Sequence, residues 1–536
     1  QTHGPITCEE LSRELALPRE IAMAVLGSLA ASGRVLRGEF RPTGNTEEWV
    51  DVEVLRLLRR RTLASLRHAV EPVGPADLAT FLQHWQGLGS EKLTLVETLG
   101  QLQGAALVGS MLESDHLRPR CAEYDPSELD LLISQGEVLW VGAGGVGTTD
   151  GRVRLYFRAD LKTLAEPPEP STTPASPHHV AIRERLSHHG ASFWADLVAG
   201  CSEAGLAYDN DTVLGALWDL VWSGEVTNDS LHPLRHRTMN ASAPRVSTVV
   251  AKSGRARRGL RATVPLSAAG RWSLVWGTAP NVVAPEPTAT ASASGSASAA
   301  GSSSSGSASA TVKPLATVKS LARAEQLLAR YGVLTREMAL SEGMDAGFAG
   351  VYPVLKTLEE RGTVRRGYFV AGLGAAQFAL PAAVDDLRRA NFDGAIILAA
   401  DDPAQPYGAV LRWPESQGRP SRSVGARVVM VAGRPVAWLD RTGRSLVSFQ
   451  TERTELEGSA PDSPAGAEVS PEQRDIEWLT TLAARVSAGE LRFGKSRSLE
   501  ITKVNGEPVR TSHLRGPLEQ AGFVESYRGM VLRAPR

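Results

Sequence analysis

The sequence predicts an α+β protein of several domains, built from a repeated helix–glycine–strand unit and a later set of short strands. The clearest unit is residues 358–369, where an amphipathic helix ends at Gly362 and a strand with two arginines follows. Residues 29–40 match it at the leucine, both glycines, the valine, the second arginine and the final aromatic residue, and weaker copies lie at 132–140 and 220–226. Because the unit recurs, we expect a tandem array.

A helix that ends at glycine and runs into a short hairpin with a basic tip is typical of a winged helix. In such a domain the hairpin is the wing, and Arg37, Arg365 and Arg366 would lie on wing strands. We therefore predict tandem winged-helix domains that bind nucleic acid through these arginines. Winged helices also serve purely as packing or assembly units, and this second interpretation stays open.

The composition limits the number of domains, the kind of binding surface and the cellular compartment. A chain of 536 residues with 42% hydrophobic residues can fill three to five cores. The net charge of -1 means that any nucleic-acid surface is local. Three distant cysteines favour a reducing compartment and no structural zinc, and we expect a cytoplasmic, nucleoid-associated protein. No apolar run is long enough for a membrane span, and the start without methionine indicates a piece of a longer protein.

Composition shifts and turn residues divide the chain into ten predicted segments. These are a winged helix (1–50), a winged-helix-like helical module (51–115), a winged-helix-like module with a hairpin (116–165), a linker (166–177), a winged helix with a basic segment and a strand (178–283), a disordered Ala/Ser/Gly linker (284–312), a winged helix (313–385), a small β-barrel (386–460), a linker (461–470) and a C-terminal α/β unit (471–536).

The first module begins with a capping box at 7–10, and Leu11, Leu15 and Leu17 start an apolar face. Val25, Leu26 and Leu29 continue that face at helical spacing, up to the turn at Gly33.

Residues 142–147 have the spacing G-x-G-x-x-G of a dinucleotide-binding loop. Such a site needs a helix after the glycines, because the helix N-terminus faces the pyrophosphate. Residues 152–157 instead alternate as a strand does, so the glycines are predicted to form a hairpin loop.

The strongest local charge lies between Asp229 and Glu286, where no acidic residue occurs. The basic residues that we predict to bind phosphates there are Arg245, Lys252, Arg255, Arg257, Arg258 and Arg261. A solvated loop explains the same composition, and both interpretations stay open.

Short strands between 395 and 449, separated by Gly, Pro and Asp turns, predict a small β-barrel. Asp401 and Asp402 are expected in an exposed turn. A final unit near 499–530 repeats the helix–glycine–strand pattern. No G-x-x-x-x-G-K-[ST] motif occurs, so we expect no ATPase activity and no cofactor in this chain.

Several runs resemble the C-terminal half of bacterial large helicase-related proteins, in their actinobacterial version. They are 47–51, 57–63, 71–73, 81–85, 101–104, 270–273, 366–374 and 376–381. The resemblance implies an ATP-dependent 3′-to-5′ translocase of DNA repair that unwinds DNA or RNA:DNA hybrids, with ATP and Mg²⁺ bound by a motor upstream. It also implies single-stranded or branched DNA as a partner and a homo-oligomer, a tetramer.

The architecture is also similar to AlkZ-type DNA glycosylases, whose catalysis rests on two glutamines, or a glutamine and an aspartate, around one apolar residue. Gln101 and Gln103 have that form. Two amides can orient a water toward an extruded nucleotide, although neither is a good base. The alternative is that both cap a helix end. The run that begins at Gln377 has alanine where the pattern needs a second polar residue, so we assign no catalytic role to Gln377.

Three functions therefore remain: a DNA-binding and oligomerising region of a repair helicase, a glycosylase that uses Gln101 and Gln103, and a purely structural assembly module.

Overall fold

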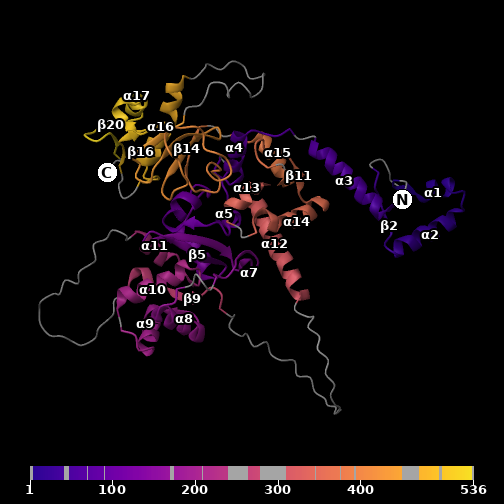
Figure 1. The fold of residues 1–536 in the computed structure, drawn as a ribbon, viewed down its shortest axis with the longest axis horizontal. Coiled ribbons are helices and arrows are strands. Elements are labelled where there is room, and N and C mark those ends of the chain that lie inside the picture. Colours follow the sequence, from indigo (N-terminus) through magenta and orange to yellow (C-terminus); the bar gives the residue numbers. More distant parts are fainter. Residues whose placement is uncertain are drawn as a thin grey trace, which may run out of the picture.

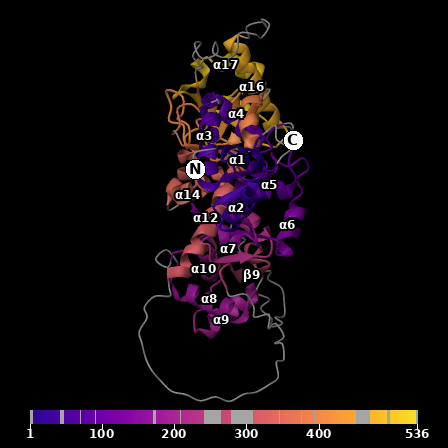
Figure 2. The same cartoon turned by 90° about the vertical axis from the view of Figure 1, so that its right-hand side faces the viewer.

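A computed structural model provides the fold (Figure 1). It describes residues 4–41, 47–68, 71–89, 91–169, 174–207, 209–239, 264–277, 309–343, 346–374, 376–391, 394–449, 470–493 and 498–533. Seen from the side, the main body is a column with α16 and α17 near one end and α8 and α9 at the other (Figure 2).

Five three-stranded sheets share one topology, in which the last strand lies between the first two. Their orders are β1-β3-β2, β4-β6-β5, β7-β9-β8, β10-β12-β11 and β17-β21-β20. The strands are β1 Ile6–Thr7, β2 Val35–Gly38, β3 Glu48–Asp51, β4 Leu107–Val108, β5 Val138–Val146, β6 Asp150–Phe157, β7 Ser192–Phe193, β8 Val226–Asn228, β9 Arg271–Leu274, β10 Val333–Leu334, β11 Arg365–Gly367, β12 Gln377–Ala379, β17 Leu499–Ile501, β20 Val524–Glu525 and β21 Met530–Leu532. In each sheet the helical segment falls between the first two strands, which is the winged-helix arrangement.

The helices around these sheets are α1 Cys8–Glu14, α2 Arg19–Ala31, α3 Val52–His68, α4 Pro75–Trp85, α5 Leu95–Leu102, α6 Pro126–Ser134, α7 Leu161–Leu164, α8 Pro177–His189, α9 Trp194–Glu203, α10 Asn210–Trp222, α11 His232–Met239, α12 Ser309–Tyr331, α13 Arg336–Ser341, α14 Gly347–Glu360, α15 Pro381–Arg389, α16 Pro471–Ser487 and α17 Arg515–Gln520. Short helical turns η1 Gly109–Met111 and η2 Leu112–Leu117 follow β4.

The repeated glycine ends the helix in every copy of the sequence unit. Gly33, Gly136, Gly224 and Gly362 have φ of 70°, 77°, 82° and 79°, and Gly522 in the last unit has 90°. An L side chain rarely adopts this left-handed conformation, so glycine is required where the helix turns into the wing strand. The predicted repeat is confirmed.

The second and third winged helices share one apolar core, which draws on α5, α6, α8, α9 and α10. The glycines of 142–147 lie in the β5–β6 hairpin, as predicted, but Gly142, Gly144 and Gly145 belong to strand β5 and Gly147 lies in the turn. A register shift between Gly142 and Gly145 marks a bulge in the strand.

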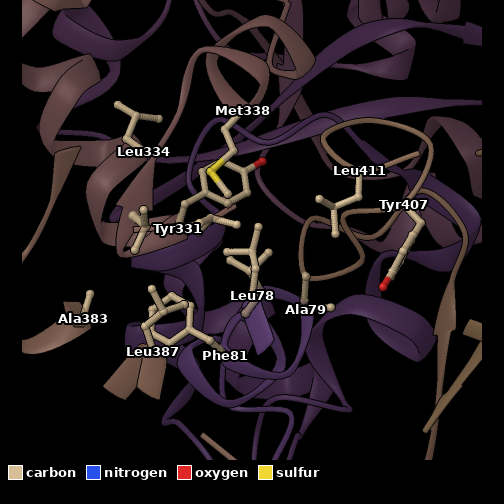
Figure 3. Packing of buried hydrophobic residues seen from close by; sticks show 14 of the residues in the cluster. Leu78, Ala79, Phe81, Tyr331, Leu334, Met338, Ala383, Leu387, Tyr407 and Leu411 are labelled. Atoms are coloured by element: carbon tan, nitrogen blue, oxygen red, sulfur yellow. The ribbon is translucent and has the colours of Figure 1, made fainter. Parts of the chain in front are cut away.

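Helix α4 lies at the centre of the other large core (Figure 3). Its Leu78 and Phe81 pack with Tyr331 of α12 and Leu387 of α15, and the same core continues onto the strands after residue 395.

The barrel expected over 386–460 is wrong for the described residues, which form an open six-stranded sheet in the order β13-β14-β15-β16-β18-β19. The strands are β13 Ala395–Ala399, β14 Arg427–Val431, β15 Arg434–Leu439, β16 Ser445–Ser448, β18 Lys503–Val504 and β19 Glu507–Pro508. The physical reason is that β16 pairs with β18 of the C-terminal unit, so the sheet grows away from β13 and does not close on it.

Residues 284–308 of the expected linker lie outside the described residues. The last four residues of that linker, 309–312, belong to helix α12.

Candidate nucleic-acid interface

The wing of the first winged helix carries Arg37 on β2. Its guanidinium forms an ion pair with Glu47 and lies 5.6 Å from the ring centroid of Trp49. The pair is exposed to solvent, so its attraction is weak. Arg37 is on the wing as predicted, but Glu47 neutralises much of its charge.

The wing of the fourth winged helix carries Arg365 and Arg366 on β11. Arg365 is exposed. The guanidinium of Arg366 lies 5.7 Å from the ring of Tyr352 and 5.8 Å from that of Phe378. Stacking on aromatic faces leaves the N–H edges of a guanidinium free to donate to an anion.

Helix α3 packs against β11 and carries a second set of arginines (Figure 1). Arg59, Arg60 and Arg61 are exposed on α3 and form no ion pair within the described residues. We call Arg59, Arg60, Arg61, Arg365 and Arg366 the α3–β11 surface. Successive side chains of a helix point about 100° apart, so the three arginines of α3 do not all face β11. Positive charges on two adjoining elements nevertheless suit the phosphates of a nucleic acid.

The other predicted basic residues, Arg245, Lys252, Arg255, Arg257, Arg258 and Arg261, lie outside the described residues. In the sequence they fall between β8 and β9, the two strands of the third wing.

Gln101 and Gln103 lie at the C-terminal end of α5, and their side chains have separate partners. Gln101 donates from Nε2 to the carbonyl of Trp85 at 2.6 Å. Gln103 accepts from the backbone N–H of Phe157 at 2.6 Å and donates to Asp160 at 3.1 Å and to Gln326 at 3.3 Å. The two side chains therefore share no partner among the described residues.

Gln103 lines a cavity of about 250 Å³, which we call the Gln103 pocket. Other residues that line it are Arg154, Tyr156, Glu166, Arg323, Gln326, Arg330 and Glu342. Arg330 is almost fully buried and donates to the carbonyls of Gln101 and Gln103, and it pairs with Glu342 at 2.5 Å. It thus satisfies carbonyl groups left open at the end of α5. Burial alone would raise the pKa of Glu342, but the charge of Arg330 outweighs it and lowers that pKa.

Sequence reasoning missed Asp160, Gln326 and Arg330. Gln326 and Arg330 come from α12, more than 220 residues after Gln103, and no local pattern links them to α5. A carboxylate is a better base than either amide of the predicted pair, and the fold places the carboxylate of Asp160 beside Gln103.

A separate buried cluster joins the second winged helix to the open sheet. Asp402, expected in an exposed turn, is fully buried between Arg120 and His116. Burial would raise the pKa of Asp402, but the attraction of Arg120 and the hydrogen bond from His116 hold it well below its usual range. All three side chains are wholly inaccessible, so we assign this cluster a structural role.

Within the described ranges no three His, Cys, Asp or Glu side chains gather as metal ligands would. No helix in that part of the chain combines the length and apolar character needed to cross a membrane.

Two segments match family descriptions. Residues 73–158 and residues 313–395 each match the winged-helix domain of the large helicase-related protein. They contain the second and the fourth winged helix of the structure.

Two curated relatives match almost the whole chain. A protein of Mycolicibacterium smegmatis described as Lhr helicase/probable uracil glycosylase is 36% identical over 570 residues, which is 99% of this chain and 33% of the relative. The Lhr helicase/uracil glycosylase of Escherichia coli is 30% identical over 569 residues, again 99% and 33%. The chain therefore spans about a third of the length of these relatives.

Among solved structures, the DNA glycosylase AlkZ of Streptomyces sahachiroi is similar at a TM-score of 0.40 and 14% identity. The match covers 76% of this chain and 96% of that one.

Proposed function

We propose that the chain is a DNA-binding region of a DNA-repair helicase. The proposal starts from the match of two segments to winged-helix domains of the large helicase-related protein. The parent activity would be ATP-dependent 3′-to-5′ unwinding of DNA or RNA:DNA hybrids. ATP and Mg²⁺ would be bound by motor domains in the same polypeptide, because this chain has no phosphate-binding loop.

The observation that carries the proposal is the α3–β11 surface. Its arginines come from two elements packed together, and no described acidic side chain pairs with Arg365 or Arg366. Phosphate contacts of this kind provide affinity without sequence readout. We expect single-stranded or branched DNA to bind here in a salt-dependent way.

The test is binding of the full chain to a labelled single strand over a series of salt concentrations. We expect the double variant Arg365→Ala/Arg366→Ala to lower the slope of log affinity against log salt by about 1.4, at roughly 0.7 per phosphate contact of a single strand. The matched control is Arg528→Ala/Arg533→Ala. It removes the same charge from exposed positions in the C-terminal unit, far from α3 (Figure 1).

If both double variants keep the wild-type slope, the α3–β11 surface does not contact phosphates. If the wild-type chain does not bind DNA even at low salt, the interpretation as a structural assembly module replaces the proposal.

Self-association belongs to the same proposal. We propose a homo-oligomer, a tetramer, near the nucleoid in the cytoplasm. Sedimentation equilibrium of the chain over a hundredfold range of concentration tests it, and a constant monomer mass would refute it.

A second candidate function is removal of a base, because one curated relative is described as a uracil glycosylase and the other as a probable uracil glycosylase. The specific observation here is that Gln103 faces a pocket and lies 3.1 Å from the carboxylate of Asp160. A carboxylate is a far better general base than an amide, so Asp160 would activate the water that Gln103 orients.

Strand scission by alkali after incubation with uracil-containing single strands tests this second function. We expect abasic sites with the wild-type chain and about a hundredfold fewer with Asp160→Asn. The control is Asp211→Asn, an exposed aspartate on the third winged helix. Abasic sites at the wild-type rate in Asp160→Asn would remove Asp160 from the reaction.

A further inference from the structure

A second and larger cavity lies between the second and the third winged helix. It has a volume of about 610 Å³, inside the range of roughly 300–1,000 Å³ that is usual for ligand sites. Its walls come from the β5–β6 hairpin, from α10, α11 and the end of the third wing, and from Ala165, Glu166, Pro168 and Pro174 after α7. We call it the interwing groove, and the residues that matter here are Gly142, Arg154, Tyr156, Trp222, Arg237 and Trp276.

Two glycines of the β5–β6 hairpin allow the end of α10 to lie directly against the hairpin. A Cβ on Gly142 would lie 1.8 Å from the carbonyl oxygen of Val221, and a Cβ on Gly151 would lie 2.4 Å from the ring of Trp222. Only glycine lets the end of α10 reach the hairpin this closely. Gly142, the first glycine of the run that resembles a nucleotide loop, and Gly151 thus let the two winged helices dock and hold Trp222 in place.

The formal charges that line the groove are balanced, but the arginines and the carboxylates differ in how they are paired. Two arginines and two carboxylates line it. Glu166 already pairs with Arg323 at 2.7 Å, and Asp219 lies 3.2 Å from His179. Neither Arg154 nor Arg237 forms an ion pair with a described residue, and Nε of Arg237 is buried without a hydrogen-bond partner. The site therefore has guanidinium groups available for an anion.

Flat aromatic surfaces accompany these charges. Trp222 and Trp276 are partly exposed to the groove. Trp222 is supported by the buried Trp218, with ring centroids 4.9 Å apart, and Trp276 donates from its indole N–H to the carbonyl of Gly224 at 3.0 Å. Rings held in this way can accept a planar base with little loss of side-chain freedom.

The groove and the Gln103 pocket adjoin, because Arg154, Tyr156, Ala165 and Glu166 line both. A ligand in the groove can therefore extend along β6 toward Gln103. A chain of linked units fits this shape better than a compact molecule does.

We propose that the interwing groove binds a short stretch of single-stranded DNA, with phosphates on Arg154 and Arg237 and bases stacked on Trp222 and Trp276. Paired bases in a duplex do not offer their faces to a side chain, so the groove selects for single strands. The inference rests on the proposed function, because it assumes that the chain binds DNA. It adds a separate site, remote from the α3–β11 surface (Figure 1).

The first measurement compares single-strand and duplex affinity of the full chain for Arg154→Ala. The expected result is a roughly tenfold loss for the single strand, a salt slope lower by about 0.7, and little change for the duplex. Arg154→Lys should keep the slope, because the charge remains. Arg152→Ala is the matched control, since Arg152 is half-buried on the same strand and does not line the groove.

The second measurement needs no variant. A single strand with 5-iodouracil at successive positions is photocrosslinked to the wild-type chain, and the adducts are mapped by mass spectrometry. Adducts on Trp222, Trp276 or Tyr156 support the proposal.

The proposal is overturned if Arg154→Ala binds single strands as the wild type does and every adduct maps elsewhere. That result leaves the proposed function intact as long as the wild-type chain binds DNA. If the wild-type chain binds neither DNA form, both proposals fail together. Equal losses for single strand and duplex would assign Arg154 to a general phosphate contact and would overturn the selective site.

Discussion

The first winged helix and the docked pair formed by the second and third share one strand order but differ in how they are stabilised. The first has a small core of Cys8, Ala22, Leu26 and Trp49. The pair shares a core that contains four tryptophans, Trp140, Trp194, Trp218 and Trp272. The comparison shows that the local pattern of helix, glycine and strand sets the topology, whereas the neighbours of each module set its stability.

The same contrast holds for charged groups. In the first winged helix Arg41 pairs with Glu10 at 2.9 Å, and both side chains are well exposed. In the second, Arg120 pairs with Asp402 at 2.6 Å, and neither is exposed at all. Solvent screens the first pair, while the second depends wholly on its partners.

The largest effect is expected from Asp402→Ala. The change leaves the guanidinium of Arg120 buried with only Gln86 and the carbonyl of His116 as acceptors. Breaking one side of a buried ion pair costs about 3–5 kcal/mol. Hydrogen exchange should therefore accelerate strongly in peptides from η2 and β13, the two elements that the cluster joins. Glu10→Ala is the control and should change exchange only locally in α1; if the two variants behave alike, the contrast between buried and exposed pairs is mistaken.

The stability that the two ion pairs contribute should also respond differently to acid and salt. The pKa of Asp402 lies below its usual value of 3.8, so this carboxylate contributes stability above that pH and loses it as the pH falls further. Arg41 lowers the pKa of Glu10 to about 2, so the stability that Glu10 contributes is also lost as the pH falls. Because Glu10 is exposed, only its contribution should weaken with added salt.

The measurement is hydrogen exchange between about pH 4 and pH 2 at low and high salt, with correction for the intrinsic rates. Peptides around Asp402 should lose protection at the same pH in both salts. If the pH at which these peptides lose protection changes with salt, water reaches the Asp402 cluster.

Two glycine substitutions should change the free energy of unfolding in opposite directions. In the docked pair, Gly142→Ala forces the end of α10 away from β5, and overpacking of this kind costs about 1–3 kcal/mol. In the first winged helix, a Cβ added to the exposed Gly27 of α2 would meet no atom within 4 Å, and Gly27→Ala should stabilise that helix by about 0.5–1 kcal/mol. Thermal unfolding read by near-ultraviolet circular dichroism reports on the tryptophans of the pair, and exchange in α2 reports on Gly27. Stabilisation by Gly142→Ala would contradict the close docking.

The sequence predicted what is local. The repeated unit, the wing arginines Arg37, Arg365 and Arg366, and the hairpin after Gly142 follow from spacing and turn chemistry, which act over a few residues. The barrel was wrong because the partner of β16 lies more than 50 residues later, in β18.

Burial was also harder to predict than periodicity. Leu15, Leu17 and Val25 continue the apolar spacing of the first module, yet all three are exposed. The partners of Gln103 could not be predicted either, because Asp160 and Gln326 reach it only through the packing of separate domains.

The smallest effect is expected from Ile21→Ser in the first winged helix. Ile21 is 50% exposed on α2, so the change removes little buried apolar area, and exposed substitutions usually alter stability by less than about 0.5 kcal/mol. Urea unfolding followed by exchange in α2 measures it, with sedimentation velocity to follow the mass. A loss above about 1 kcal/mol, or a drop in mass, would mean that another copy or element covers this face in solution. The first winged helix would then resemble the docked pair, and its stability too would come from its neighbours.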